Sequence, residues 1–251
     1  NNFRSVFSFT DGTAYNIAAT FNLQRNSVDQ PIYPRSGSQI SLSTKLTLPY
    51  SFWRKDSLGG YPDYASMESA EKYKWIEYYK IKFSAAWYTK LVENLVLYNR
   101  IGFGFLGSYD KNLGTAPFER FYLGGGGLSG FSLDGREIIA LRGYDDGSLS
   151  PDFGATSIVK YKMELRYPIS LNPSATVYGL GFAEAGNSWT SFKEFNPFAV
   201  KRSAGIGLRI FLPMFGILGL DYAWRFDDVK NRPFMQKSQF HFTIGIELGE
   251  L

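Results

Sequence analysis

The stretch that decides the fold is Ile158-Val159-Lys160-Tyr161-Lys162-Met163-Glu164-Leu165-Arg166-Tyr167. Apolar residues take every second position from Val159 to Tyr167, and every position between them is charged. Side chains of a strand alternate between two faces, so this segment predicts a strand with one apolar and one charged face. The charged face meets bulk water on a soluble β-sandwich, and a polar lumen in a membrane barrel.

The same alternation recurs along the chain and predicts about nine strands. These strands are residues 15–23, 39–48, 79–89, 95–105, 158–167, 175–186, 202–212, 215–225 and 239–248, and residues 3–9 fit the end of another. Their length of roughly 10 residues exceeds the 5–6 usual in soluble sheets and matches the requirement for a tilted membrane strand.

The connections between the predicted strands alternate in length. Tyr88 to Leu95 and Leu212 to Phe215 are tight, whereas residues 49–78, 106–157 and 187–201 are long. Short periplasmic turns and long external loops produce this asymmetry in outer-membrane barrels. The pattern therefore favours an all-β fold, a transmembrane antiparallel β-barrel, and leaves a soluble β-sandwich as the alternative.

The composition agrees with a barrel and argues against several other kinds of protein. Aromatic residues make up 18% of the chain at only average hydropathy, which suits an apolar outside and a wet inside. There is no cysteine and only one histidine, His241, so thiolate sites are excluded and histidine-built metal sites or catalytic triads are improbable. The net charge of +4 is not gathered into one run, unlike that of a nucleic-acid binder. We expect no enzyme activity, no cofactor and no nucleic-acid partner.

No segment of the sequence predicts a membrane-spanning helix. The longest apolar run, Ile210 to Leu220, is interrupted by Pro213 and is shorter than the roughly 18 residues required. A membrane-embedded chain of this sequence would therefore cross with strands. The opening residues, 1–4, lack the basic and apolar regions of a signal peptide, so we expect a mature or truncated piece.

Three segments occur in an order that points to a family. They are Tyr33-Pro34-Arg35-Ser36-Gly37, then Phe121-Tyr122-Leu123-Gly124-Gly125 with Leu141-Arg142-Gly143-Tyr144, and finally residues 203–213 followed by Gly216-Ile217-Leu218 and Asp221-Tyr222-Ala223. Together they resemble the C-terminal part of BamA-type outer-membrane assembly factors, over nearly the whole chain. That superfamily also holds TamA and the two-partner secretion translocators. The resemblance implies that residues 1–251 are the C-terminal part of a barrel of about sixteen strands, with the POTRA domains and first strands absent from the chain.

The resemblance also implies a functional loop motif, Leu141, Arg142, Gly143 and Tyr144, that folds back into the barrel lumen. Its lumen partners would be Glu164 on one strand and Phe182, Glu184 and Gly186 on the next; the family usually has aspartate where Glu184 stands. A guanidinium is always charged, and its planar fork matches carboxylates. We therefore expect Arg142 within hydrogen-bond reach of Glu164 or Glu184. The competing interpretation is that Arg142 is an ordinary arginine of a solvated loop.

The function that the resemblance implies is the folding and insertion of client barrel proteins in the bacterial outer membrane. The barrel would open at a lateral seam beside its last strand, where Gly245 matches the family glycine that lets this strand kink. Expected partners are outer-membrane lipids, unfolded client barrels and accessory periplasmic lipoproteins. Family members often end in an aromatic residue, whereas this chain ends at Leu251. A translocator of the same superfamily and a passive porin or receptor barrel remain as alternatives.

Other residues receive simpler interpretations. His241 alternates with the apolar face of its strand and is predicted to face the lumen. Gly124 to Gly127 lack the lysine and helix of a phosphate loop and predict a closely packed turn. Lys72-Tyr73-Lys74 predicts a solvated loop face. Trp75, Trp87 and Trp189 lie near strand ends and suit the aromatic girdles of a membrane protein.

Overall fold

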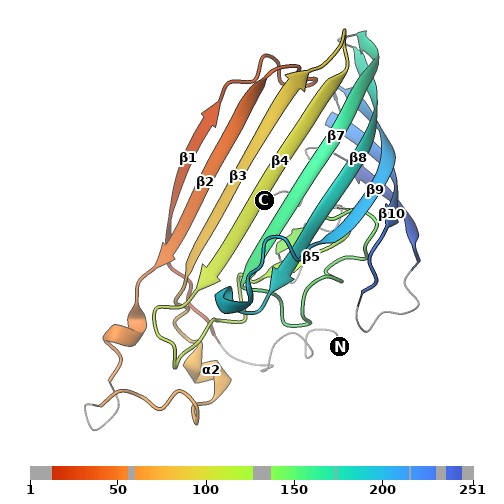
Figure 1. Cartoon of the computed structure of the whole chain (residues 1–251). Helices are drawn as coiled ribbons and strands as arrows, with labels where there is room; N and C mark the ends of the chain where they lie inside the picture. The colour runs from red at the N-terminus through yellow and green to blue at the C-terminus, as the bar shows by residue number, and fades with distance from the viewer. Residues whose placement is uncertain are drawn as a thin grey trace.

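A computed structural model describes residues 13–55, 60–126, 137–172, 174–214, 216–229 and 236–244. Its main feature is one curved antiparallel sheet of nine strands in the order β1-β2-β3-β4-β7-β8-β9-β10-β11 (Figure 1). The strands are β1 (Ala18–Asn26), β2 (Gly37–Thr47), β3 (Tyr79–Lys90), β4 (Val96–Gly107), β7 (Ser157–Asn172), β8 (Ala175–Trp189), β9 (Lys201–Leu212), β10 (Gly216–Arg225) and β11 (Ser238–Ile244). All nine predicted strands are present, the first of them at residues 18–26 instead of 15–23, and residues 3–9 and 245–248 lie outside the described residues.

The strand connections fall into two sets at opposite ends of the sheet. Residues 48–78, 108–156, 190–200 and 226–237 connect strands at one end, and residues 27–36, 91–95, 173–174 and 213–215 at the other. The long and tight connections predicted from the sequence are where we expected them. Within the described residues, no helix is long and apolar enough to cross a membrane.

β7 extends five residues past the predicted end at Tyr167. Pro168 lacks a backbone N–H, and the register with β8 shifts between Pro168 and Ser170. Such a bulge lets a strand continue past a proline that cannot donate to the ladder.

The two faces of β7 point in the predicted directions. Lys160, Lys162, Glu164 and Arg166 are buried on the concave side, and Met163, Leu165 and Tyr167 are exposed on the outer side. Two expected lipid-facing residues are not exposed: Val159 is fully buried and Tyr161 is half-buried.

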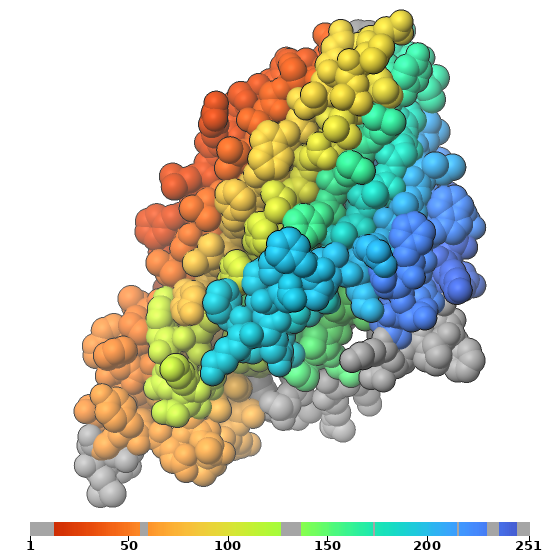
Figure 2. Space-filling model, in the orientation of Figure 1, coloured from red at the N-terminus to blue at the C-terminus, as the bar shows by residue number. Residues whose placement is uncertain are grey.

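The burial of Val159 has a cause in the β8–β9 connection, residues 190–200, which lies across the outer face of the sheet (Figure 2). Tyr161 Oη donates to Pro197 O at 3.1 Å, and the ring of Phe195 lies 6.4 Å from that of Phe103, which is paired with Val159. The prediction that Val159 faces lipid was therefore wrong, because this connection covers that part of the wall.

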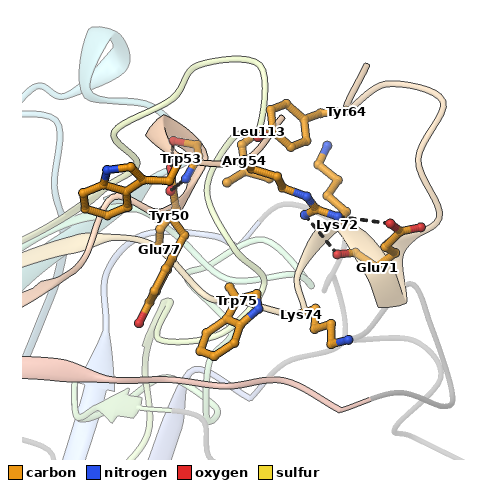
Figure 3. A pocket seen from close by; sticks show the side chains of 11 residues that line it. Tyr50, Trp53, Arg54, Tyr64, Glu71, Lys72, Lys74, Trp75, Glu77 and Leu113 are labelled. Atoms are coloured by element: carbon orange, nitrogen blue, oxygen red, sulfur yellow. Dashed lines mark hydrogen bonds and ion pairs between the residues drawn. The ribbon is translucent and has the colours of Figure 1, made fainter. Parts of the chain in front are cut away.

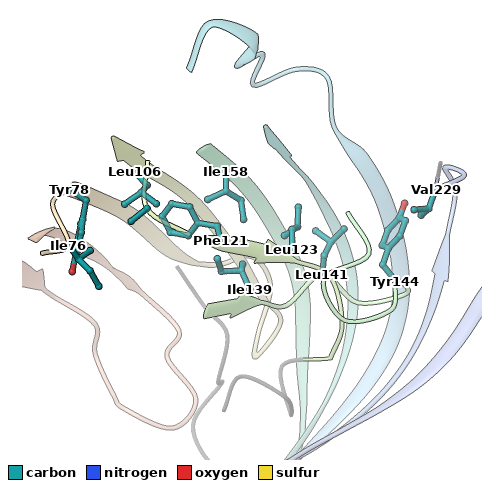
Figure 4. Close-up of a cluster of buried hydrophobic side chains, with 11 residues drawn as sticks. Ile76, Tyr78, Leu106, Phe121, Leu123, Ile139, Leu141, Tyr144, Ile158 and Val229 are labelled. Carbon is teal, nitrogen blue, oxygen red and sulfur yellow. The ribbon is translucent and has the colours of Figure 1, made fainter. Parts of the chain in front are cut away.

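The core of the molecule lies on the concave side of the sheet. The β4–β7 connection, residues 108–156, folds back there and contributes the short parallel pair β5 (Phe121–Leu123) and β6 (Glu137–Ile139). Apolar side chains of this connection pack against the wall (Figure 4). The cluster contains Ile76, Tyr78, Leu106, Ala116, Phe121, Leu123, Ile139, Leu141, Tyr144, Ile158 and Val229. This packing fixes the motif that follows β6.

A charged cluster at the centre of the lumen

The motif at residues 141–144 is anchored on both sides of Arg142. Leu141 is fully buried in the core and forms a bridge with Gly125, and Gly125 N donates to Tyr144 O at 2.9 Å. Tyr144 Oη donates to Arg202 O at 2.7 Å, which ties the motif to the start of β9. Gly143 has φ +88°, a left-handed conformation that favours glycine. The turn at Gly143 directs Arg142 toward the wall.

Arg142 binds three carboxylates that come from three different strands. Its Nη2 donates to Glu164 Oε1 at 2.8 Å on β7 and to Glu184 Oε1 at 2.7 Å on β8. Its Nε also donates to Glu184 Oε1 at 3.0 Å, its backbone N to Glu184 Oε2 at 2.9 Å, and its Nη1 to Asp221 Oδ1 at 3.2 Å on β10. The guanidinium carbon lies 3.5 Å from the ring centroid of Phe182, so the group is stacked on an aromatic face. The predicted contacts of Arg142 with Glu164 and Glu184 are confirmed.

The carboxylates around Arg142 have further basic partners. Arg166 Nη2 lies 2.7 Å from Glu164 Oε2, and Lys162 Nζ lies 3.4 Å from Glu164 Oε1. Arg209 donates to both oxygens of Asp221 at 2.9 Å. Burial alone lowers the pKa of Arg142, but the charges of Glu184, Glu164 and Asp221 outweigh it and raise that pKa well above its ordinary value. The cluster is therefore a dense ionic network, hereafter the lumen clasp: Arg142, Glu164, Glu184, Asp221 and Arg209.

The loop also contacts the last described strand, β11. Gly143 N donates to His241 Nε2 at 2.9 Å, and Gln239 Nε2 donates to Asp145 Oδ1. His241 is 9% exposed and faces the lumen, as predicted. The lumen clasp and these two bonds connect one loop to β7, β8, β9, β10 and β11.

A second ionic group binds the same loop to the opposite part of the wall. Lys80 Nζ lies 3.2 Å from Glu119 Oε2 and 2.5 Å from Glu137 Oε2, and Lys82 Nζ lies 2.8 Å from Glu137 Oε1. Lys45 on β2 lies 2.5 Å from Glu119 Oε1. Burial alone raises the pKa of Glu119, but the charges of Lys80 and Lys45 outweigh it and lower that pKa to about 2. We did not identify this group from the sequence, although its lysines occupy the polar face of two predicted strands.

The structure brings together all the predicted site residues that it describes. Gly186 faces the motif from β8, and a Cβ there would lie 3.1 Å from Leu141 Cδ1 and 2.8 Å from Val159 O, so only glycine permits this approach. Gly245 lies outside the described residues. Asp221, which binds Arg142, and Arg209, which binds Asp221, were missed, although their position on the inward face could have been read from strand alternation. Trp75 lies in the β2–β3 connection, just before β3, and its place in an aromatic girdle stays a prediction.

The contacts of the lumen clasp are ion pairs and hydrogen bonds. Each of its carboxylates accepts hydrogen bonds from guanidinium groups, and none faces a hydroxyl nucleophile in the contacts described above. In the described part of the chain, no three histidine, aspartate or glutamate side chains are arranged to hold a metal ion. A buried pair of this kind costs several kcal/mol when one partner is removed, so the clasp holds the loop in a single position.

Comparison with known proteins identifies the family and the fold. The chain matches the Omp85 superfamily domain over residues 6–248. Its fold is similar to that of BamA from Haemophilus ducreyi in a crystal structure lacking POTRA domains 1–3, with a TM-score of 0.64 and 20% sequence identity. The match covers 92% of this chain and 42% of the BamA chain, so this chain spans less than half of that relative's length. No curated protein sequence matches. The fold is that of the C-terminal portion of a BamA-type barrel, and the chain belongs to the Omp85 superfamily.

Proposed function

We propose that residues 1–251 are the C-terminal part of the barrel of an outer-membrane assembly factor, which folds and inserts client barrel proteins. The observation that carries this proposal is the contact between the luminal loop and the end of the sheet. The loop binds the wall from β7 to β11 through the lumen clasp, His241 and Gln239. A passive pore needs no such connection between its lumen and one terminal strand.

The two ends of the sheet set a physical requirement on the whole protein. β1 and β11 each pair with one neighbour in the described sheet. A free strand edge in lipid leaves backbone groups without hydrogen bonds, at a cost of several kcal/mol per group. In our proposal, strands outside this chain close the barrel, POTRA domains precede those strands, and the seam lies between β11 and the first strand.

The proposed mechanism is strand addition at the seam. The seam opens sideways, and a client strand pairs with the exposed edge of β11 through main-chain hydrogen bonds. The loop contacts to His241 and Gln239 keep β11 on the wall while its outer edge is free. Gly245 would let the following segment bend away, because glycine weakens strand pairing.

The proposed partners follow from this mechanism. Lipids of the outer membrane contact the exposed apolar side chains of the outer face, among them Met163 and Leu165. Unfolded client barrels contact the seam, and accessory periplasmic lipoproteins act with the proposed POTRA domains. No bond chemistry and no cofactor is needed.

Depletion of the full-length protein in its own bacterium tests this proposal. We expect many different barrel proteins to lose their heat-resistant folded form in the outer membrane, and a wild-type copy to restore them. The loss of one exported soluble protein, with all barrels intact, would instead indicate a translocator. Intact assembly together with a steady conductance of the purified protein would indicate a porin.

A further inference from the structure

A cavity lies in the β2–β3 connection, apart from the lumen clasp (Figure 3). Its volume is about 510 Å³, within the range of small-molecule sites. One wall comes from η1 (Tyr50–Phe52) and the residues after it, and the other from α2 (Ser69–Lys72) and the residues after it. Tyr64 and Leu113, both buried, complete the lining. The proposed assembly mechanism makes no use of this cavity.

Two tryptophan rings beside the cavity are exposed. Trp53 is 66% exposed and Trp75 is 40% exposed. The ring of Trp75 is held in place, because its centroid lies 4.8 Å from that of Tyr15 and 5.1 Å from that of Tyr50. Trp53 is the more exposed of the two, and the flat face of an indole suits the C–H face of a sugar ring.

The charges around the cavity favour an anion. Arg54 crosses from η1 to α2 and donates to Glu71 O and to Glu71 Oε1, both at 3.2 Å (Figure 3). The buried Glu77 accepts from Ser51 N at 2.8 Å and from Ser51 Oγ at 3.0 Å, so both carboxylates of the lining are engaged. Lys72 and Lys74 also line the cavity, and neither forms an ion pair with a carboxylate of the described residues. Lys72 Nζ lies 5.6 Å from the ring centroid of Tyr73, and the side chains of Lys72 and Lys74 point to different sides of the cavity (Figure 3), so each ammonium group is available to its own anionic group of a ligand.

We propose that this cavity binds a phosphorylated saccharide, with a sugar ring on Trp53 and separate phosphate groups at Lys72 and at Lys74. Lysine ammonium groups bind phosphate as compact point charges. The cavity lies at the end of the sheet that carries the long connections, which in outer-membrane barrels faces outward. The saccharide is then either the headgroup of a glycolipid in the outer leaflet or a free polysaccharide. Only this statement about the source rests on the proposed membrane location.

Titration calorimetry on the full-length protein in detergent micelles tests the site. The probes are the phosphorylated core oligosaccharide released from lipopolysaccharide by mild acid, the same oligosaccharide after removal of its phosphates, and intact lipopolysaccharide. We expect binding of the phosphorylated oligosaccharide, weakened by about tenfold or more in Trp53→Ala and in the double variant Lys72→Ala/Lys74→Ala. Lys111→Ala, which removes an exposed lysine of another long connection, should bind as the wild type does.

Two results would support different sources of the same ligand. Equal affinity for the free oligosaccharide and for lipopolysaccharide indicates recognition of the sugar alone. Much tighter binding of lipopolysaccharide, still sensitive to Trp53→Ala, indicates a glycolipid. The proposal is overturned if the dephosphorylated oligosaccharide binds as tightly as the phosphorylated one, if the variants bind as the wild type does, or if none of the probes binds. A heat-modifiable gel shift shows that each variant is folded, and no readout depends on client assembly.

Discussion

Replacing Arg142 with alanine should release the luminal loop from the wall. Glu164 would keep Arg166 and Lys162, and Asp221 would keep Arg209. Glu184 would lose both donors to its Oε1 and keep the backbone N–H of residue 142 at Oε2, with the charges of Lys160 and Lys162 nearby. The substitution therefore leaves one buried carboxylate without its ion-pair partner, because the Glu184 side chain is only 1% exposed.

The magnitude follows from the loss of that hydrogen-bonded ion pair. Breaking a buried ion pair by removing one partner typically costs roughly 3–5 kcal/mol, and loss of the stack on Phe182 adds about 0.5–2 kcal/mol. We expect Arg142→Ala to lower the free energy of loop docking by about 3.5–7 kcal/mol, which is about 2.5 to 5 powers of ten in the equilibrium. Glu184→Gln in the same chain removes the orphaned charge and should recover roughly 1 kcal/mol or more.

The assay is limited proteolysis of residues 108–156 in the full-length protein, together with its urea midpoint in detergent. Arg142→Ala should be cleaved much faster than the wild type, and the double variant Arg142→Ala/Glu184→Gln should be cleaved more slowly than Arg142→Ala. The cleavage rate of Arg142→Lys should lie between those of Arg142→Ala and the wild type, because lysine keeps the charge but lacks the planar fork of the guanidinium. Wild-type protease resistance and an unchanged midpoint in Arg142→Ala would refute the claim that this cluster holds the loop.

Three further predictions test other parts of the structure. Gly205→Ala should destabilise the barrel by roughly 1–3 kcal/mol, because its Cβ would lie 2.2 Å from Tyr222 O and 2.5 Å from Phe182 Cζ, whereas Gly181→Ala, with no atom within 4 Å, should be neutral in the same urea titration. The pKa of Glu119 is held at about 2, below its ordinary 4.5, so the stabilisation from its lysine contacts is present above pH 4.5 and lost as the pH falls toward 2. Glu119→Gln should remove this part of the pH dependence of loop proteolysis, and an unchanged profile would contradict it. Amide hydrogen exchange should be faster in β11 than in β7, because β7 is paired on both sides and β11 on one side in the described sheet; equal rates would contradict this.

Strand alternation predicted the sheet because successive side chains of a strand point to opposite faces, so the face of each residue depends only on whether it is an odd or an even position along the strand. Ile158 to Tyr167 therefore shows both its strand and its inward face. The bulge after Pro168 was not predicted from the sequence. An extra residue in a strand exchanges the inward and outward positions that follow it, and the alternation pattern gives no sign of where this happens. β5 and β6, with three residues each, are too short for any periodicity to show.

The partners within the site depend on the curvature of the whole sheet. The contact of Arg142 with Glu164 followed from the family resemblance. Its contact with Asp221, 79 residues away, requires that β10 curve round to face the same loop. Lys45 and Glu119 are 74 residues apart and meet only because the loop folds back across the sheet. Alternation gives the face of each residue and does not give such distances.

The central claim is that the outer edge of β11 opens to admit client strands, and a disulfide across the seam tests it most directly. Residues 1–251 contain no native cysteine, so an introduced cysteine cannot form a disulfide with a native cysteine of this chain. Phe242→Cys joined to a cysteine on the first strand of the full-length protein should block assembly of client barrels, and reduction should restore it. The matched control joins Phe242→Cys to Leu220→Cys, its registered partner on β10, and should assemble clients normally. Normal assembly by the seam-locked protein, with the disulfide shown to be complete, would contradict lateral opening at β11.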